Sequence, residues 1–215
     1  MSGSVKPRRA YVSPRRREQA RATRAAILEA ARDLFIERGY VATTMQAIAD
    51  QAGVAPETVY STFGTKRSLL SSVIDVSITG DNEPLPLLER AWVQDMRAEP
   101  DARRRVQILA RNGSRILERM SPIYEVLRGA AAADLGVTSL WELHKSQRLA
   151  GQRELVRIVG ARGSLRQGLT ARQATDIVFT IGSPETYQLL TADRNWSSAR
   201  FERWYADTLA RLLLS

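Results

Sequence analysis

The sequence predicts an all-α protein with a small N-terminal helical unit and a larger C-terminal one. Apolar residues recur at spacings of three and four along most of the chain, and no stretch alternates apolar and polar residues as a strand does. Glycine and other turn-forming residues interrupt this pattern, most densely at residues 79–84 (TGDNEP). These features divide the chain into a basic arm (1–18), a four-helix unit (19–80) and a larger helical unit (81–215).

The composition fits a folded chain that lacks sulfur chemistry. With 215 residues, of which 44% are hydrophobic, the chain is long enough to bury a core. It has no cysteine, which excludes disulfides, thiolate nucleophiles and zinc sites built on sulfur. No stretch approaches the roughly 18 apolar residues of a membrane span, and the basic N-terminus lacks the apolar run of a secretory signal. We therefore expect a cytoplasmic protein with no membrane contact and no cofactor.

Residues 1–18 are predicted to form a disordered basic arm. They combine prolines, serines and basic side chains with almost nothing apolar, and Arg15, Arg16 and Arg17 lie near their end. Most of the net charge of +9 falls in the first third of the chain. Such an arm is either a solvated tail or a segment that binds phosphates or a minor groove.

The first predicted helix covers residues 20–38. Its apolar residues share one face: Ile27, Leu28, Ala31, Leu34 and Phe35. Gly39 is expected to end this helix as its C-terminal cap. A short second helix over residues 45–52 follows, and Thr43 and Thr44 offer its N-cap.

Gly53 separates the second helix from a third one, predicted over residues 55–63. Pro56 lies in the first turn of this third helix, where a missing N–H does no harm. Gly64 ends it, and a fourth helix is predicted over residues 66–78. Two short helices joined by a tight glycine turn, with small polar side chains outside the second, are typical of a helix-turn-helix.

The rest of the chain is predicted to contain six further helices. They are expected over residues 85–96, 102–119, 122–134, 138–159, 170–190 and 197–214. Residues 160–168 are expected to form a polar loop, and no internal repeat is present.

Residues 23–70 (TRAAILEAARDLFIERGYVATTMQAIADQAGVAPETVYSTFGTKRSLL) strongly resemble the TetR family. The residues that carry this resemblance are Ile27, Ala30, Ala31, Leu34, Phe35, Gly39, Tyr40, Thr43, Thr44, Ile48, Ala49, Ala52, Gly53, Val54, Tyr60, Phe63 and Lys66. The resemblance implies a transcriptional regulator that binds DNA through residues 19–80. It further implies that residues 81–215 bind an effector and form a dimer.

Candidate DNA contacts lie on and around the third helix. Its outward residues, expected to read bases, are Ala55, Pro56, Thr58, Ser61 and Thr62. None of these side chains offers the bidentate contact of Arg, Asn or Gln, so each discriminates weakly. Tyr60, Lys66 and the N-terminus capped by Thr44 are expected to contact phosphates. Arg15, Arg16 and Arg17 are expected to add affinity that does not depend on sequence.

The terminal helix carries a broad apolar stripe that needs a partner. Together with residues 183–190 (SPETYQLL) and 195–197 (NWS), this helix is similar to the C-terminal part of many family members. The resemblance implies that the last two helices pack against their copies in a two-fold four-helix bundle. The candidate interface residues are Tyr187, Leu190, Phe201, Trp204, Tyr205, Leu209 and Leu212.

A central cavity for a small molecule is implied by the same resemblance. Its candidate lining residues are Trp92, Met96, Ile108, Ile116, Met120, Tyr124, Leu127, Trp141 and Phe179, together with His144, the single histidine. Ordinary core packing is the alternative for each apolar residue in this set. His144 either contacts a ligand or faces solvent.

We therefore expect a DNA-binding repressor that a small-molecule effector releases from a palindromic operator, and not an enzyme. An activator, or a regulator without a small-molecule ligand, is the alternative within the same class. Two alternatives come from other classes: an all-α enzyme acting on a small apolar substrate, and a non-specific architectural DNA-binding protein. The lone histidine and the lack of metal-ligand or catalytic patterns argue against an enzyme.

Overall fold

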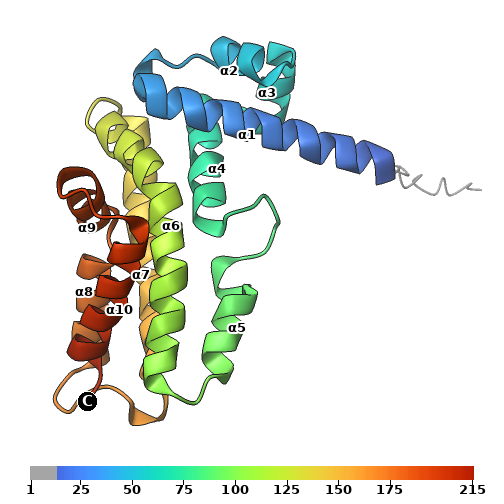
Figure 1. Cartoon of the computed structure of the whole chain (residues 1–215). Coiled ribbons are helices and arrows are strands. Elements are labelled where there is room, and N and C mark those ends of the chain that lie inside the picture. The colour runs from blue at the N-terminus through green and yellow to red at the C-terminus, as the bar shows by residue number, and fades with distance from the viewer. Residues whose placement is uncertain (1–13) are drawn as a thin grey trace, which may run out of the picture.

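Four helices form a small head across one end of the molecule (Figure 1). The structure, a computed structural model, describes residues 14–215 apart from the side chains of residues 14 and 162. The head comprises α1 (Pro14–Ala42), α2 (Met45–Ala52), α3 (Pro56–Phe63) and α4 (Lys66–Thr79). The predicted all-α class and the helix-turn-helix arrangement are confirmed.

Helix α1 differs from its prediction at its start. It begins at Pro14, so Arg15, Arg16 and Arg17 are helical, and the expected disordered arm is wrong for residues 14–18. Proline suits the first turn, and the arginine, glutamate, glutamine and alanine that follow favour helix. The remaining arm residues, 1–13, lie outside the described residues. Gly39, with φ of 76° and ψ of 169°, is not helical, so the regular helix ends here as expected, and the last residues of α1 form a separate helical turn beyond this kink.

The remaining elements form a C-terminal body of long, roughly aligned helices (Figure 1). Its α-helices are α5 (Ala91–Ala98), α6 (Ala102–Ala131), α7 (Leu135–Val159), α8 (Ala171–Ile181), α9 (Pro184–Gln188) and α10 (Ser198–Leu213). Three shorter helical turns are η1 (Leu87–Glu89), η2 (Ala161–Gly163) and the π-turn η3 (Leu189–Asp193). Across the described helices, none has the length and apolar character needed to cross a membrane.

Helix α6 replaces the two helices expected over residues 102–119 and 122–134. It continues through Pro122, where the sequence predicted a break. Residues on both sides of the proline share one buried face: Leu117, Met120, Ile123, Tyr124 and Leu127. Burial of this face offsets the one backbone hydrogen bond that a proline cannot donate.

The segment expected as one helix over residues 170–190 is broken. Helix α8 ends before Gly182, and Ser183 caps α9 by accepting a hydrogen bond from the Thr186 amide at 3.0 Å. The expected polar loop at residues 160–168 is anchored, because it contains η2 and the Arg166 amide donates to the Leu213 carbonyl at 2.9 Å.

Two hydrophobic cores meet along α6. One core joins the four head helices to the C-terminal half of α6 and the start of α7. The other core joins the N-terminal half of α6 to α5, α8, α10 and the end of α7. Helix α6 therefore connects the head and the body.

Tyr205 of α10 is wedged between two glycines in the body. A Cβ atom on Gly113 would lie 3.1 Å from the Tyr205 ring, and one on Gly182 would overlap its hydroxyl group. The Cβ on Gly182 would also lie 2.9 Å from the Val178 carbonyl oxygen. Only glycine therefore fits at residue 182 without displacing the ring of Tyr205.

Gly182→Ala is expected to destabilise the protein by about 1–3 kcal/mol, because the added methyl group overpacks the Tyr205 site. The matched control is Gly129→Ala within α6, where nothing lies within 4 Å of the added Cβ and helix propensity favours alanine by about 1 kcal/mol. Urea unfolding measures both changes. Equal stabilities of the two variants would contradict the wedged position of Tyr205.

Candidate DNA-binding surface and ligand cavity

Helix α3 lies on the outside of the head, joined to α2 by a glycine turn (Figure 1). Gly53, with φ of 67°, adopts the left-handed conformation that closes this turn. Half-buried Val54 packs against the head core, and Val59 and Phe63 bury the inner face of α3. The opposite face of α3 is left free, as in a recognition helix.

The five residues expected to read bases lie at the free face and its edges. Ala55, Ser61 and Thr62 are exposed, while Pro56 and Thr58 are half-buried. The Ser61 and Thr62 hydroxyls donate to the Thr58 carbonyl at 3.1 and 2.6 Å. Their oxygen atoms can still accept hydrogen bonds, so this face suits single contacts to base amino groups.

Thr43 and Thr44, next to each other before α2, make different hydrogen bonds. Thr44 is the N-cap, since its hydroxyl oxygen accepts a hydrogen bond from the Ala47 amide at 3.1 Å. Thr43 is fully buried and donates to the Leu34 and Gly39 carbonyls at 3.1 and 2.8 Å. The first amides of α2 that Thr44 does not bond have no partner within the helix. The ring of Tyr60 on α3 is exposed.

Lys66, expected to contact a phosphate, is bonded inside the head. Its ammonium donates to the Tyr40 and Thr43 carbonyls at 2.8 Å each and lies 4.4 Å from the centre of the Tyr40 ring. Burial lowers the pKa of Lys66, while nearby Asp134 acts in the opposite direction. The expectation is corrected: Lys66 ties the connection between α1 and α2 to the start of α4.

A second cation, which sequence reasoning missed, holds the other end of α4. The Arg119 guanidinium of α6 donates to the Ser77 and Ile78 carbonyls at 3.1 and 3.2 Å. Cations near a helix C-terminus satisfy carbonyls that have no partner within the helix. Nothing in the local sequence around Arg119 indicates this contact, because its partners are about 40 residues away in the chain.

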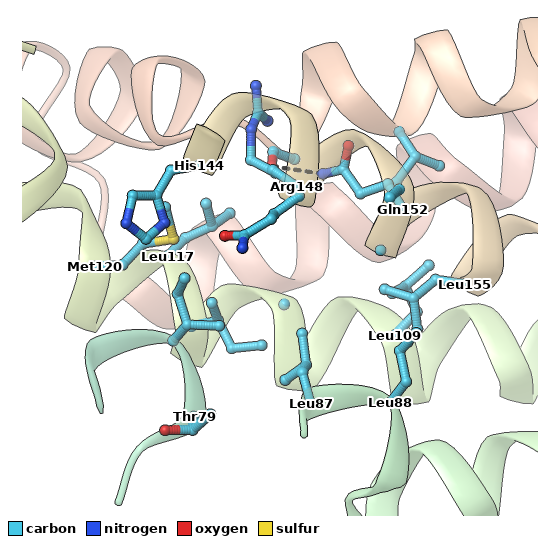
Figure 2. A pocket seen from close by; sticks show the side chains of 18 of the residues that line it. Thr79, Leu87, Leu88, Leu109, Leu117, Met120, His144, Arg148, Gln152 and Leu155 are labelled. Carbon is cyan, nitrogen blue, oxygen red and sulfur yellow. Dashed lines mark hydrogen bonds between the residues drawn. The ribbon is translucent and has the colours of Figure 1, made fainter. Parts of the chain in front are cut away.

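The body contains a cavity of about 710 Å³, lined mainly by apolar side chains of α4, α6, α7 and the segment around η1. Figure 2 shows Leu88, Leu109 and Leu155 toward one end of it and Met120 and His144 toward the other.

The wall around η1 differs from the helical walls. It contributes Pro86, Leu87 and Leu88 to the cavity, yet no residue of η1 is buried. An ion pair between Arg90 and Asp81, 2.9 Å between Nη2 and Oδ1, closes the loop that carries this wall.

About half of the expected lining residues face this cavity. Those that line it are Trp92, Ile116, Met120, Tyr124 and His144. Those that do not are Met96 and Leu127, which are fully buried in the cores, and Ile108, Trp141 and Phe179, which are half-buried. Trp141 packs against Tyr124 with ring centroids 4.8 Å apart, as a core residue does. The structure therefore favours core packing for these five residues.

The polar lining of the cavity was largely missed by sequence reasoning. It comprises Asp75, Thr79, Gln147, Arg148, Gln152 and Tyr205. His144, Arg148 and Gln152 are four residues apart on α7, a polar stripe next to buried Leu155 that could have indicated a site. The Asp75 contribution could not be seen, because α4 was assigned wholly to the head.

His144 is buried, with 5% of its surface exposed, and its Nε2 atom has no hydrogen-bond partner. Burial lowers the pKa of His144, while nearby Asp75 acts to raise it, so the imidazole is neutral at pH 7. Burial raises the pKa of Asp75, and His144 acts to lower it. A carboxyl group and a neutral imidazole therefore lie together at the cavity wall.

Most of the expected dimer-interface residues belong to the core of the single chain. Tyr187, Phe201, Tyr205 and Leu209 are buried, because α9 and α10 pack against α6 of the same chain. This corrects the expectation that a second subunit must cover the stripe on α10. The remaining candidates, Leu190, Trp204 and Leu212, keep partly exposed side chains.

Comparison with known proteins finds sequence similarity in the N-terminal part of the chain. Residues 27–73 match the model of the bacterial regulatory proteins of the tetR family. The transcriptional regulator TtgR of Pseudomonas putida is 41% identical over 61 residues, which are 28% of this chain and 29% of TtgR. The match to this curated relative thus spans less than a third of its length.

Two solved structures share the fold of nearly the whole chain. Native NalD, the secondary repressor of the MexAB-OprM multidrug efflux pump in Pseudomonas aeruginosa, has a TM-score of 0.68 at 20% identity, covering 91% of this chain and 98% of NalD. FadR from Bacillus subtilis, in complex with stearoyl-CoA, has a TM-score of 0.64 at 19% identity, covering 86% and 96%.

Lys66→Met is expected to destabilise the protein by about 1–3 kcal/mol, because the Tyr40 and Thr43 carbonyls lose a charged donor. The control is Arg21→Met, an exposed position on α1 where the change stays within about 0.5 kcal/mol. Thermal unfolding without DNA measures both. An unchanged midpoint for Lys66→Met would return this residue to the role of a phosphate contact.

Proposed function

We propose that this chain, a member of the TetR family by its N-terminal domain and its fold, is a transcriptional repressor that a small-molecule effector releases from DNA. The observation that carries this proposal is α4, which begins in the helix-turn-helix domain and ends at the cavity wall. We assign residues 19–80 to DNA binding and residues 81–215 to effector binding and dimerisation.

The free face of α3 is the surface that enters the major groove in this proposal. Its small side chains give single hydrogen bonds and contacts to thymine methyl groups, so each half-site is read weakly. Exposed Tyr60 and the amides at the start of α2 contact phosphates and fix the register. Exposed Arg15, Arg16 and Arg17 extend α1 with positive charge that any duplex attracts.

Effector binding is supported by the cavity and by what similar folds hold. A volume of about 710 Å³ with a mainly apolar lining suits a small organic molecule. NalD is a repressor, and FadR was crystallised with stearoyl-CoA. The family match favours a regulator over an all-α enzyme.

The two ends of α4 provide the coupling between effector and DNA. Lys66 joins the start of α4 to the head, and Asp75, Ile78 and Thr79 bring its end to the cavity. A ligand that contacts these residues favours one position of α4 over another. Only such differential contact can shift the equilibrium between DNA-binding and released forms.

Selection of DNA fragments from a random pool tests the repressor proposal. At physiological salt, we expect the selected duplex to compete at least about a thousandfold better than an unrelated duplex. Thr58→Ala on α3 should reduce this ratio, whereas Thr180→Ala, exposed on α8, should not. Equal competition by both duplexes would support the alternative of a non-specific architectural protein.

We further propose a homodimer that reads a palindromic operator. A dimer presents two α3 helices to successive major grooves, about 34 Å apart, and compensates for the weak reading by each. Partly exposed Leu190, Trp204 and Leu212, beside Leu189 with 56% of its surface exposed, are the apolar residues left for such an interface.

Replacing Trp204 and Leu212 together by Glu is expected to give monomers that lose operator binding, because charge is placed at the apolar contact. The control replaces the exposed neighbours Arg203 and Arg211 by Gln on the same helix. Analytical ultracentrifugation measures the mass, and circular dichroism checks the fold. A wild-type monomer at micromolar concentration that still protects a palindromic site would defeat the dimer proposal.

A further inference from the structure

Two polar side chains at the end of the cavity nearest the head lack protein partners. The Asp75 carboxylate makes no hydrogen bond or ion pair to any residue in the described part of the chain, apart from its electrostatic interaction with His144. The His144 imidazole is likewise without a hydrogen bond among residues 14–215, and its Nε2 atom is buried. The Asp75 side chain is exposed, whereas the His144 Nε2 atom is buried, where polar atoms are normally bonded, so both groups are acceptors available to a ligand at this end of the cavity.

The rest of the cavity is mainly apolar and elongated. Figure 2 shows His144 near one end of the α7 wall and Leu155 near the other. The step of 11 residues from His144 to Leu155 corresponds to about 16 Å along a helix at about 1.5 Å per residue. Leu88, Leu109 and Leu155 form the far end. The space therefore fits a long apolar group that ends in one polar group.

Arg148 carries the positive charge at the cavity, and two contacts hold it in place. The Arg148 guanidinium stacks 3.6 Å from the centre of the Phe179 ring and donates to the Phe179 carbonyl at 3.0 Å. These contacts hold its charge at the α8 wall. Among the described residues, Arg148 forms no ion pair and its Nε atom has no hydrogen-bond partner, but its guanidinium is anchored by these contacts, whereas the Asp75 carboxylate has no such contact and can turn to a ligand.

We propose that the cavity binds an amphipathic organic cation whose ammonium group contacts Asp75 and His144 and whose apolar chain lies along Leu88, Leu109 and Leu155. This inference rests on the proposed function, because it names the chemical class of the effector. An ammonium group offers up to three N–H donors and one positive charge. A carboxylate and an imidazole nitrogen accept two of these donors and balance the charge.

Binding of a cation at Asp75 acts directly on the helix that leaves the head. Asp75 lies one turn before Thr79 on α4, and Arg119 holds the carbonyls of the same turn region. A charge-assisted hydrogen bond at Asp75 acts on α4 directly, and no other helix or loop has to transmit its effect. Asp75, which recognises the ligand, therefore lies on α4, the helix that couples the DNA-binding and effector-binding domains.

Isothermal titration of DNA-free protein with three ligands of equal chain length tests the inference. The probes are decylammonium, decanol and decanoate. Decylammonium should bind at least about tenfold more tightly than the other two. Asp75→Asn should remove this preference and leave decanol affinity unchanged, while Asp176→Asn, which removes an exposed charge on α8, should keep it.

Several outcomes would overturn the inference. Tightest binding of decanoate would assign recognition to Arg148, and a preserved preference in Asp75→Asn would exclude Asp75. Decanol binding verifies that the variant cavity is intact, and the wild-type series decides the charge preference even if the variant does not fold. Since no DNA is present, failure here is distinct from failure of the repressor proposal.

Discussion

Lysine and arginine side chains, donating to backbone carbonyls near its two ends, fix α4 between the head and the body. Lys66 extends from the start of α4 to the connection between α1 and α2, and Arg119 extends from α6 to the last turn of α4. A carbonyl that loses a charged donor inside a protein is left unsatisfied, which destabilises that arrangement. The position of the recognition helix relative to the cavity therefore depends on these hydrogen bonds more than on the exposed loops.

The cavity lies along α6 because this helix contributes side chains to two separate hydrophobic cores. Side chains of its C-terminal half pack with the head, and those of its N-terminal half pack with α8 and α10. Between these cores, Gly113 and Gly182 admit Tyr205 and so set one wall of the open space. Small residues thus determine where the cavity lies, although large residues supply most of its surface.

The head could be predicted well from sequence, because its signals are local. Gly53, Gly64 and the cap at Thr44 mark the ends of α2 and α3 within a few residues of each feature. The body was harder, because its structure depends on distant partners. Pro122 is accepted in α6 through tertiary burial, and the stripe on α10 faces α6 rather than a second subunit. No local pattern reveals either pairing.

The same limit explains the errors in the candidate site. Sequence reasoning placed Lys66 at the DNA surface from its position after α3, whereas its acceptors are carbonyls more than twenty residues earlier. Asp75 and His144 come from helices far apart in the chain, so their proximity required the folded structure. Residues whose role depends on one helix face, such as Ile27 and Leu34 of α1, were placed correctly.

The wall around η1 has a consequence for the speed of ligand exchange. Its residues are not buried, so this segment loses few apolar contacts when it moves, and such regions open locally at low free energy. The ion pair between Arg90 and Asp81 restrains its loop, and added salt screens partly exposed pairs of this kind. We therefore expect the rates of ligand association and dissociation to increase together as ionic strength rises. Movement of this loop then sets how long the ligand stays bound.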